Sequence, residues 1–199
     1  MIEDYWDGEN WLSVIKDKIS IKYYLDEKVH RNDGPAVIFY FDNGFIGFEK
    51  YKLNGKMHRN DDGPAYIEYF ESLNGKISKE IYYQNDEMHS INGPAEIWYY
   101  KNDKIKAEFY HQNGLCYRCD GPAIIYYYPS GFISRKDYYY NNSCHKWNGP
   151  AVIFYDKNGN ISQEDYYFNG NRIKDEDINF CFPVDSKEKK FYINLKYEQ

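Results

Sequence analysis

Apolar and polar positions alternate along the chain in short runs that return at a regular interval. One run follows each Gly-Pro-Ala sequence and is rich in β-branched and aromatic side chains, as at residues 37–41 and 124–128. A second run begins at an isoleucine just after a turn sequence, for example at Ile46 after residues 43–44. Such runs, when bounded by turn residues, predict β-strands, and two of them joined by Asn-Gly predict a β-hairpin.

The predicted hairpin belongs to a unit that is copied in tandem. Its marker is a His-Arg-x-Asp-Gly-Pro-Ala phrase, hereafter the phrase. The glycine of the phrase recurs every 28 to 30 residues, at Gly34, Gly63, Gly93, Gly121 and Gly149. A period of this length is typical of repeat proteins, in which each unit packs on its neighbours. We therefore expect an all-β fold, an elongated antiparallel array of about five β-hairpin units over residues 18–174.

Both ends of the chain depart from the period and are expected to cap the array. Residues 1–17 contain Trp6, Trp11 and Leu12, and residues 175–199 contain several further aromatic side chains. Terminal units of repeat arrays usually need such caps. Between the first cap and the first phrase, residues 18–30 have the pattern of a second strand without its partner, as in a truncated unit.

The second strand of each unit is predicted to run on to a tight turn. Its closing pair is Asn-Gly, Asn-Asp or Asn-Asn, at residues 54–55, 85–86, 113–114, 141–142 and 169–170. Glycine, asparagine and aspartate are the residues that best tolerate a positive φ angle. We therefore expect backbone geometry to select these pairs.

The two faces of the first strand differ, because side chains two residues apart point the same way. One phase is nearly constant from unit to unit, as in Ala36, Ile38 and Tyr40, and suits a packed face. The other phase varies, and one of its positions holds Phe39, Glu68, Trp98, Tyr126 and Phe154. We predict that these five residues contact a protein partner. The alternative is that curling of the sheet or a cap buries them.

Two other repeated patterns are interpreted as structural. The second strand carries Glu-x-Tyr, as in Glu49 and Tyr51, which suits a half-solvated sheet. The phrase histidines align with an acid or amide, in the pairs His30 with Asp33, His58 with Asp62, His89 with Asn92 and His145 with Asn148. Neighbouring copies would lie about 9–10 Å apart, too far for a shared metal. We expect His and Asp to tie the loop to its Gly-Pro turn through backbone hydrogen bonds, and we predict no catalytic residue.

Cysteine spacing raises the question of a metal site. Cys116 and Cys119 have the spacing of a zinc knuckle, but Cys116 and Cys144 occupy a position held elsewhere by Val29 and Met57. Because buried thiols behave as small apolar groups, we expect no metal and no cofactor. A disulfide between Cys116 and Cys144 is conceivable, although a cytosolic setting disfavours it.

Charge and composition narrow the partners further. The net charge of −6 argues against binding to nucleic acid or to an anionic membrane. The sequence has no long apolar run and begins with an acidic segment, so it predicts neither membrane insertion nor a signal peptide. We expect a soluble cytoplasmic protein, in the host cytoplasm if the chain is viral.

Part of the unit resembles a known family. Residues 51–56, 82–87, 110–115 and 166–171 resemble divergent MORN-type repeats, including those of bacterial antitoxin-like proteins. The phrase is also similar to tandem repeats of large DNA viruses and phages. The resemblance covers about residues 18–172 and implies an elongated antiparallel β array that is used for binding and has no catalytic residues.

Together these patterns predict a non-enzymatic protein–protein interaction module or scaffold with an aromatic-rich surface. One alternative is an antitoxin or counter-defence inhibitor that binds and blocks an enzyme. Another is a receptor for a small ligand or glycan, because rows of exposed Tyr and Trp can stack on sugars and bases. The identity of the partner lies beyond the sequence.

Overall fold

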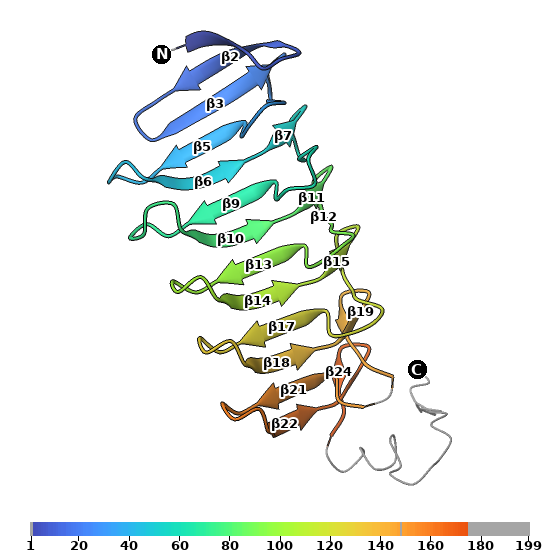
Figure 1. The fold of residues 1–199 in the computed structure, drawn as a ribbon. Helices are drawn as coiled ribbons and strands as arrows, with labels where there is room; N and C mark the ends of the chain where they lie inside the picture. The colour runs from blue at the N-terminus through green and yellow to red at the C-terminus, as the bar shows by residue number, and fades with distance from the viewer. Residues whose placement is uncertain (1, 148, 175–199) are drawn as a thin grey trace.

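The chain folds as an elongated array of antiparallel β-hairpins, as the repeat pattern predicts (Figure 1). The computed structural model describes residues 2–147 and 149–174. Within these ranges all strands of the units join one 14-stranded sheet or a short hairpin beside it. No helix in the described ranges is long and apolar enough to span a membrane. The predicted C-terminal cap, residues 175–199, lies outside the described residues.

Each of the five units contributes two neighbouring strands to the sheet. In chain order these pairs are β5 (Val37–Tyr40) and β6 (Ile46–Lys50), β9 (Tyr66–Tyr69) and β10 (Ile77–Ile81), β13 (Glu96–Tyr99) and β14 (Ile105–Phe109), β17 (Ile124–Tyr127) and β18 (Ile133–Asp137), and β21 (Val152–Tyr155) and β22 (Ile161–Asp165). Sequential strands are neighbours throughout, so the sheet grows in one direction along the chain.

The second predicted run is divided, which the sequence reading did not anticipate. After β6 the chain leaves the sheet, and its last residues form a separate small hairpin. The five small hairpins are β7 (Lys52–Leu53) with β8 (Lys56–Met57), β11 (Tyr83–Gln84) with β12 (Glu87–Met88), β15 (His111–Gln112) with β16 (Leu115–Cys116), β19 (Tyr139–Tyr140) with β20 (Ser143–Cys144), and β23 (Tyr167–Phe168) with β24 (Asn171–Arg172). Tyr51 is the junction, because its N–H donates to Ala65 of the next unit while its carbonyl accepts from His58.

The turns of the small hairpins have the predicted backbone geometry. Asn54 and Gly55 have φ angles of 51° and 85°. The equivalent residues of the other units are also positive, at 85–86, 113–114, 141–142 and 169–170. Two consecutive positive φ angles are the mark of a two-residue turn whose twist matches that of the strands.

The small hairpins stack on one another along one side of the sheet, beyond the C-terminal ends of the second strands (Figure 1). Each turn docks on the end of the preceding small hairpin. The N–H of Gly55 donates to Val29, that of Asp86 to Met57 and that of Gly114 to Met88, at 2.9–3.0 Å. The array is therefore held by two parallel sets of backbone contacts, one within the sheet and one between turns.

Every unit also buries the alanine of its phrase completely, and the third unit buries Ala107 as well. Ala36, Ala65, Ala95, Ala123 and Ala151 each have 0% exposure. The N–H of Ala95 donates to Phe109 of its own unit, and its carbonyl accepts from Tyr82 of the preceding unit. Three strands meet at this residue, which leaves room for only a methyl group.

An extra residue in the second strand bends the hairpin that the two sheet strands of each unit form. The register shifts by one residue opposite the end of the first strand, so that Gly47 lies in a β-bulge between Phe48 and Ile46. A Cβ atom at Gly47 would lie 2.8 Å from Cδ1 of Phe39 and 3.2 Å from the ring of Phe41. Glycine is therefore required here by the two rings rather than by the backbone.

Replacing Gly47 with serine is expected to lower the free energy of unfolding by about 1–3 kcal/mol, because one of the two rings must move. Urea denaturation measures the loss. Unit five provides the control, since it combines Phe154 with Asp156 and Ser162 at the equivalent positions. In a Phe41→Asp background the serine is expected to cost less, and an equal cost in both backgrounds would rule out the ring clash.

The N-terminal end is closed by a hairpin in place of a complete unit. The strands there are β1 (Ile2–Trp6), β2 (Trp11–Lys16), β3 (Ser20–Leu25) and β4 (Lys28–Val29). β3 lies between β2 and β5, so the predicted lone second strand has the β1–β2 hairpin as its outer neighbour. Leu12, Val14 and Tyr23 form a buried apolar cluster beneath this hairpin, whereas Trp6 and Trp11 are exposed.

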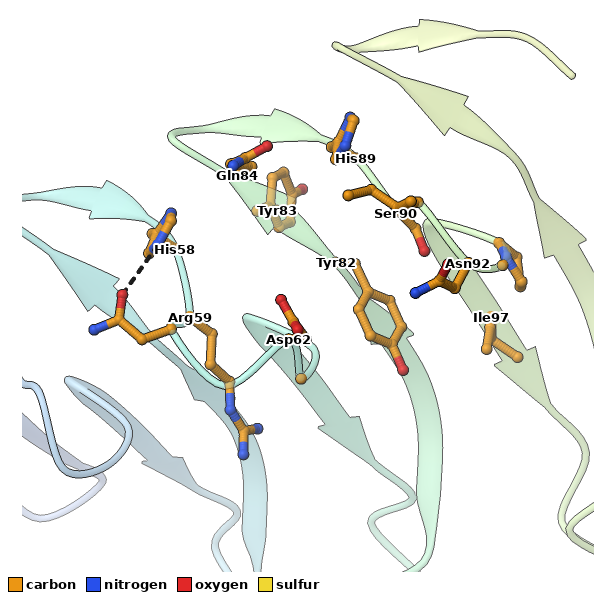
Figure 2. A pocket seen from close by; sticks show the side chains of 15 residues that line it. His58, Arg59, Asp62, Tyr82, Tyr83, Gln84, His89, Ser90, Asn92 and Ile97 are labelled. Atoms are coloured by element: carbon orange, nitrogen blue, oxygen red, sulfur yellow. Dashed lines mark hydrogen bonds between the residues drawn. The ribbon is translucent and has the colours of Figure 1, made fainter.

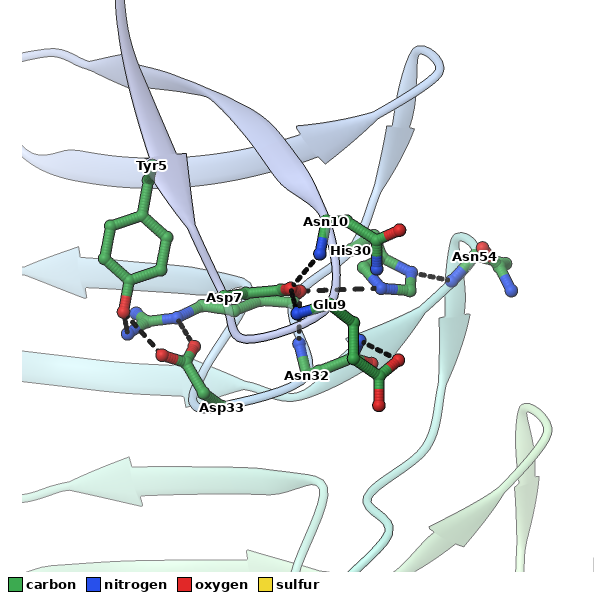
Figure 3. A network of polar contacts seen from close by, with 9 residues as sticks. Tyr5, Asp7, Glu9, Asn10, His30, Asn32, Asp33 and Asn54 are labelled. Carbon is green, nitrogen blue, oxygen red and sulfur yellow. Dashed lines mark hydrogen bonds and ion pairs between the residues drawn. The ribbon is translucent and has the colours of Figure 1, made fainter.

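Asp7 links this hairpin to the first phrase (Figure 3). Its carboxylate is buried, and one oxygen accepts from the backbone N–H of Glu9 and Asn10, at 3.0 and 2.8 Å. The other oxygen accepts from the N–H of Asn32 at 3.0 Å. Burial raises the pKa of Asp7, but these three donors and the nearby His30 outweigh it, so the pKa is lowered.

Candidate functional site

The five residues predicted to contact a partner lie in one row on one face of the sheet. Strand pairing continues the row through both strands of each unit, as Phe39, Phe48, Glu68, Lys79, Trp98, Ala107, Tyr126, Arg135, Phe154 and Gln163. We call this the varying row. All five predicted residues are half-buried. The prediction omitted the second-strand members, although their variation beside the constant Glu-x-Tyr could have identified them.

The first part of the varying row is a stack of aromatic rings. Phe39 and Phe48 lie almost parallel, with ring centroids 5.0 Å apart. Tyr66 continues the stack at 5.9 Å from Phe48, and the ammonium group of Lys50 lies 4.8 Å from the Phe48 centroid. Burial, together with the neighbouring Lys52, lowers the pKa of Lys50. These contacts order the side chains before any partner binds.

A second aromatic group occupies the middle of the row. Phe109 lies between Trp98 and Tyr126, at centroid distances of 5.0 and 5.9 Å. The ammonium group of Lys79 lies 5.0 Å from the Trp98 ring, and the indole N–H of Trp98 donates to Glu96 at 2.6 Å. Trp98 thus presents a ring whose polar edge is already satisfied.

Arg135 connects the middle of the row to its C-terminal part. Its guanidinium group lies 5.5 Å from the Tyr126 ring and 5.0 Å from the Phe154 ring, and it donates to Asp137 at 2.6 Å. Asp137 is almost fully buried, and this burial raises its pKa despite the arginine. The row therefore alternates aromatic surface with fixed charges.

The small hairpins approach the same face beside the varying row. Arg172 of β24 donates to Asp165 of β22 at 2.8 Å. Burial, together with the negative charge of Asp137, raises the pKa values of Cys116 and Cys144 to about 11. Asp137 and Asp165 are buried here, as is Ala107 within the varying row, whereas the five predicted residues of the row are half-buried.

The opposite face repeats one set of contacts from unit to unit. The Tyr69 hydroxyl donates to Glu49 at 2.8 Å. The same bond joins Tyr99 to Glu80 and Tyr127 to Glu108, at 2.6 and 2.7 Å. Each bond links the first strand of a unit to the second strand of the preceding unit. The Glu-x-Tyr pattern thus has the structural role that the sequence reading gave it.

The phrase arginines also have a structural role. Arg31, Arg59 and Arg118 stack on the rings of Tyr23, Tyr51 and Tyr110, at 4.3, 4.0 and 4.1 Å. Each arginine also pairs with an aspartate two residues later, at 2.6–2.8 Å. In the second copy this partner is Asp61, whereas the sequence alignment had chosen Asp62, an extra residue with a positive φ of 58°.

The histidine part of the expected tie to the Gly-Pro turn was wrong, whereas Asp61 makes such a tie by accepting from the N–H of Gly63 at 3.1 Å. Nδ1 of His30 accepts from the backbone N–H of Asn54, at 3.0 Å, in the turn of the next small hairpin. His89 and His145 make the same contact with Asn113 and Asn169, at 3.3 and 3.1 Å. These three histidines therefore connect neighbouring units.

Where the turn ends in Asp or Asn, a different contact replaces the histidine bond. The side chain of Asp86 accepts from the N–H of Met57 at 2.7 Å, and that of Asn142 accepts from Cys116 at 2.6 Å. In those copies His58 instead contacts Asn60, and Tyr117 stands in place of a histidine. Both kinds of hydrogen bond join a small hairpin to the turn of the next one.

The described thiols are free, and Cys116 is buried while Cys119 is exposed. Among residues 2–147 and 149–174, no group of three or more His, Cys, Asp or Glu side chains could hold a metal ion. The varying row offers flat rings and charges of both signs. Neither a scan against protein-family models nor a search of curated proteins finds a match for this chain.

Proposed function

We propose that this chain is a non-enzymatic protein-binding module that contacts its partner through the varying row. The observation that supports this best is the difference between the two faces of one sheet. The opposite face repeats the same tyrosine–glutamate bond at three successive junctions, with Lys136 over Tyr155 at the last, whereas the varying row changes its chemistry at each unit. A surface that differs from unit to unit can distinguish one partner from another.

The side chains of the varying row suit a protein interface. Trp, Tyr and Arg are enriched among the residues that dominate binding energy, and Trp98, Tyr126 and Arg135 are close together. Their rings are packed before binding, so fewer rotamers are frozen when a partner docks. The resemblance to MORN-type repeats, with its implied binding role, supports the same function.

The double substitution Trp98→Ala/Tyr126→Ala is expected to weaken partner binding by at least tenfold, because it removes two large rings from the centre of the row. The tagged chain would be used for affinity capture from lysate of its native or host cell, with mass spectrometry. The affinity of each captured protein would then be measured by calorimetry.

The matched control is Tyr99→Phe/Tyr127→Phe, which removes two hydroxyl groups from the opposite face but leaves the varying row intact. It is expected to retain the partner. Circular dichroism would check that both variants keep the β-sheet. A partner that binds the alanine variant and the wild type equally would refute the placement of the interface.

A further inference from the structure

The phrase arginines occupy a space, here called the slot, that recurs at the same position of each unit. In three copies the guanidinium group lies between a tyrosine ring and the phrase glycine. A Cβ atom on Gly34 or Gly63 would lie 2.9 or 2.8 Å from the guanidinium carbon of Arg31 or Arg59. At Gly121 the corresponding distance, to Arg118, is 3.3 Å. In these copies the arginine side chain fills the space beside the glycine.

The third copy keeps the slot but lacks the arginine. Ser90 stands at the arginine position, Asn92 stands at the aspartate position, and a Cβ atom on Gly93 would meet nothing within 4 Å. Tyr82 still provides the ring, and its N–H donates to Ala95 as the equivalent tyrosines do in other units. The two substitutions together leave an aromatic wall that no arginine of the phrase covers.

The open slot is part of a groove of about 530 Å³ (Figure 2). Figure 2 shows Asp62 and Asn92 on either side of the Tyr82 ring, with Ile97 beyond it. The groove is also lined by Gly93 and Pro94. Because Tyr82 and Ile97 lie on the face opposite the varying row, this site is independent of the proposed protein interface.

The filled copies show which groups hold the arginine. The guanidinium groups of Arg31 and Arg59 donate to the carbonyls of Pro35 and Pro64, at 3.4 and 3.3 Å. Pro94 is the equivalent residue and also lines the groove.

The acidic residues match in part, because Asn92 replaces the aspartate that pairs with each of the three arginines, whereas the glutamate of the second strand is kept. Burial lowers the pKa of Arg59, but the hydrogen bond to Asp61 outweighs it, and the charge of Glu49 adds a smaller contribution to the raised pKa. Glu80 is the equivalent residue, and its charge, after burial, raises the pKa of Tyr82. With Asp62 in the lining, the groove has the acceptors and the negative charge that a cation requires.

Arg59 also lines the groove, so a bound cation must tolerate a neighbouring positive charge. The filled copies show that the array does so. Burial raises the pKa of Tyr51, and the charges of Arg59 and Arg31 both act to lower it. A bound cation and Arg59 would act on Tyr82 in the same way. Asp61 neutralises Arg59 through an ion pair at 2.6 Å.

We propose that the groove over Tyr82 binds a guanidinium group, which takes the position held by Arg31, Arg59 and Arg118 in the other copies. An ammonium group is the closest competitor, since Lys146 lies 3.8 Å from the Tyr138 ring. The backbone distinguishes the two. Gly149 beside Lys146 has a φ of +132°, whereas Gly93 shares with the arginine copies a φ outside the positive range.

The source of the guanidinium group is an arginine side chain of a polypeptide. Ile91 lines the groove and is 83% exposed, at a position where the other copies have Asn32, Asn60, Cys119 and the likewise exposed Trp147. An apolar side chain at the rim can pack on the residue beside an arginine in a peptide, but it offers little to a free small molecule.

The test titrates Nα-acetyl-arginine amide into the isotopically labelled protein and follows backbone amide shifts of Ser90 and Gly93 by NMR. Saturable binding of one equivalent is expected. The variant Ser90→Arg/Asn92→Asp recreates the fourth copy and should weaken binding at least tenfold, whereas Ser90→Ala should retain it. The converse variant Arg118→Ser/Asp120→Asn should open a second slot over Tyr110 and double the stoichiometry.

Two further ligands make the outcome decisive. Nα-acetyl-lysine amide should bind at least fivefold more weakly than the arginine amide, and equal binding would refute the choice of guanidinium. A short peptide with arginine beside leucine should bind at least fivefold more tightly than the amide, and this advantage should disappear in Ile91→Asn. A peptide with no advantage would refute the polypeptide source, and no saturable binding of any arginine ligand would refute the site.

Discussion

Replacing Asp7 with alanine is expected to lower the free energy of unfolding by about 3–5 kcal/mol. The substitution leaves three backbone N–H groups, those of Glu9, Asn10 and Asn32, without their acceptor. Each buried donor that loses its partner costs about 1–3 kcal/mol. Urea denaturation measures the loss, and amide hydrogen exchange at Asn32 shows whether the terminal hairpin has detached.

Asp7→Asn is the matched control, because its amide keeps one oxygen acceptor and is expected to cost less. The effect should also depend on pH. Since the folded-state pKa of Asp7 is lowered from 3.8, its stabilising contribution is present above that value and is lost as the pH falls through the folded-state pKa. Wild type and Asp7→Ala should therefore approach one another in acid, and a constant difference would contradict this role of the carboxylate.

Ala95→Leu is expected to cost about 3 kcal/mol or more, because the residue is fully buried where three strands meet. Because Ala95 lies in the middle unit, the substitution should destabilise more of the array than its own unit. In a repeat array stability comes from each unit and its interfaces with its neighbours. Disrupting the central unit is thus expected to uncouple the two halves, and denaturation should show two transitions.

Ala95→Gly is the control that changes the side chain without overpacking the site. It removes a methyl group without adding volume and is expected to cost only about 1 kcal/mol. Ala151→Leu, at the last unit, should leave the unfolding of the N-terminal half unchanged. A leucine at position 95 that left one cooperative transition of normal midpoint would show that the alanine position has room to spare.

Local patterns were sufficient to predict the repeat, the first strand of each unit and the turns of the small hairpins. The period of the phrase glycines, the strand composition and the turn pairs all report backbone preferences within one unit. The positive φ angles at Asn54 and Gly55 follow from those preferences. The same alternation identified the five residues of the varying row, because strand pairing preserves side-chain phase across the sheet.

Contacts between units could not be predicted in the same way. The division of the second strand at Tyr51 depends on a backbone bond to Ala65 of the next unit, and the phrase histidine bonds to a turn of the next unit. The stacking of arginine on tyrosine joins residues that look unrelated within one copy. One signal was present, since Ser90 and Asn92 replace arginine and aspartate together.

Oxidative footprinting of the array, alone and with its captured partner, would test the proposed interface most directly, because it reads both faces of the sheet at once. The varying row predicts that Trp98, Tyr126 and Phe154 become protected on binding. Tyr69, Tyr99 and Tyr127 on the opposite face should keep their reactivity. Protection confined to those three tyrosines, with Trp98 and Tyr126 unchanged, would contradict the proposed interface.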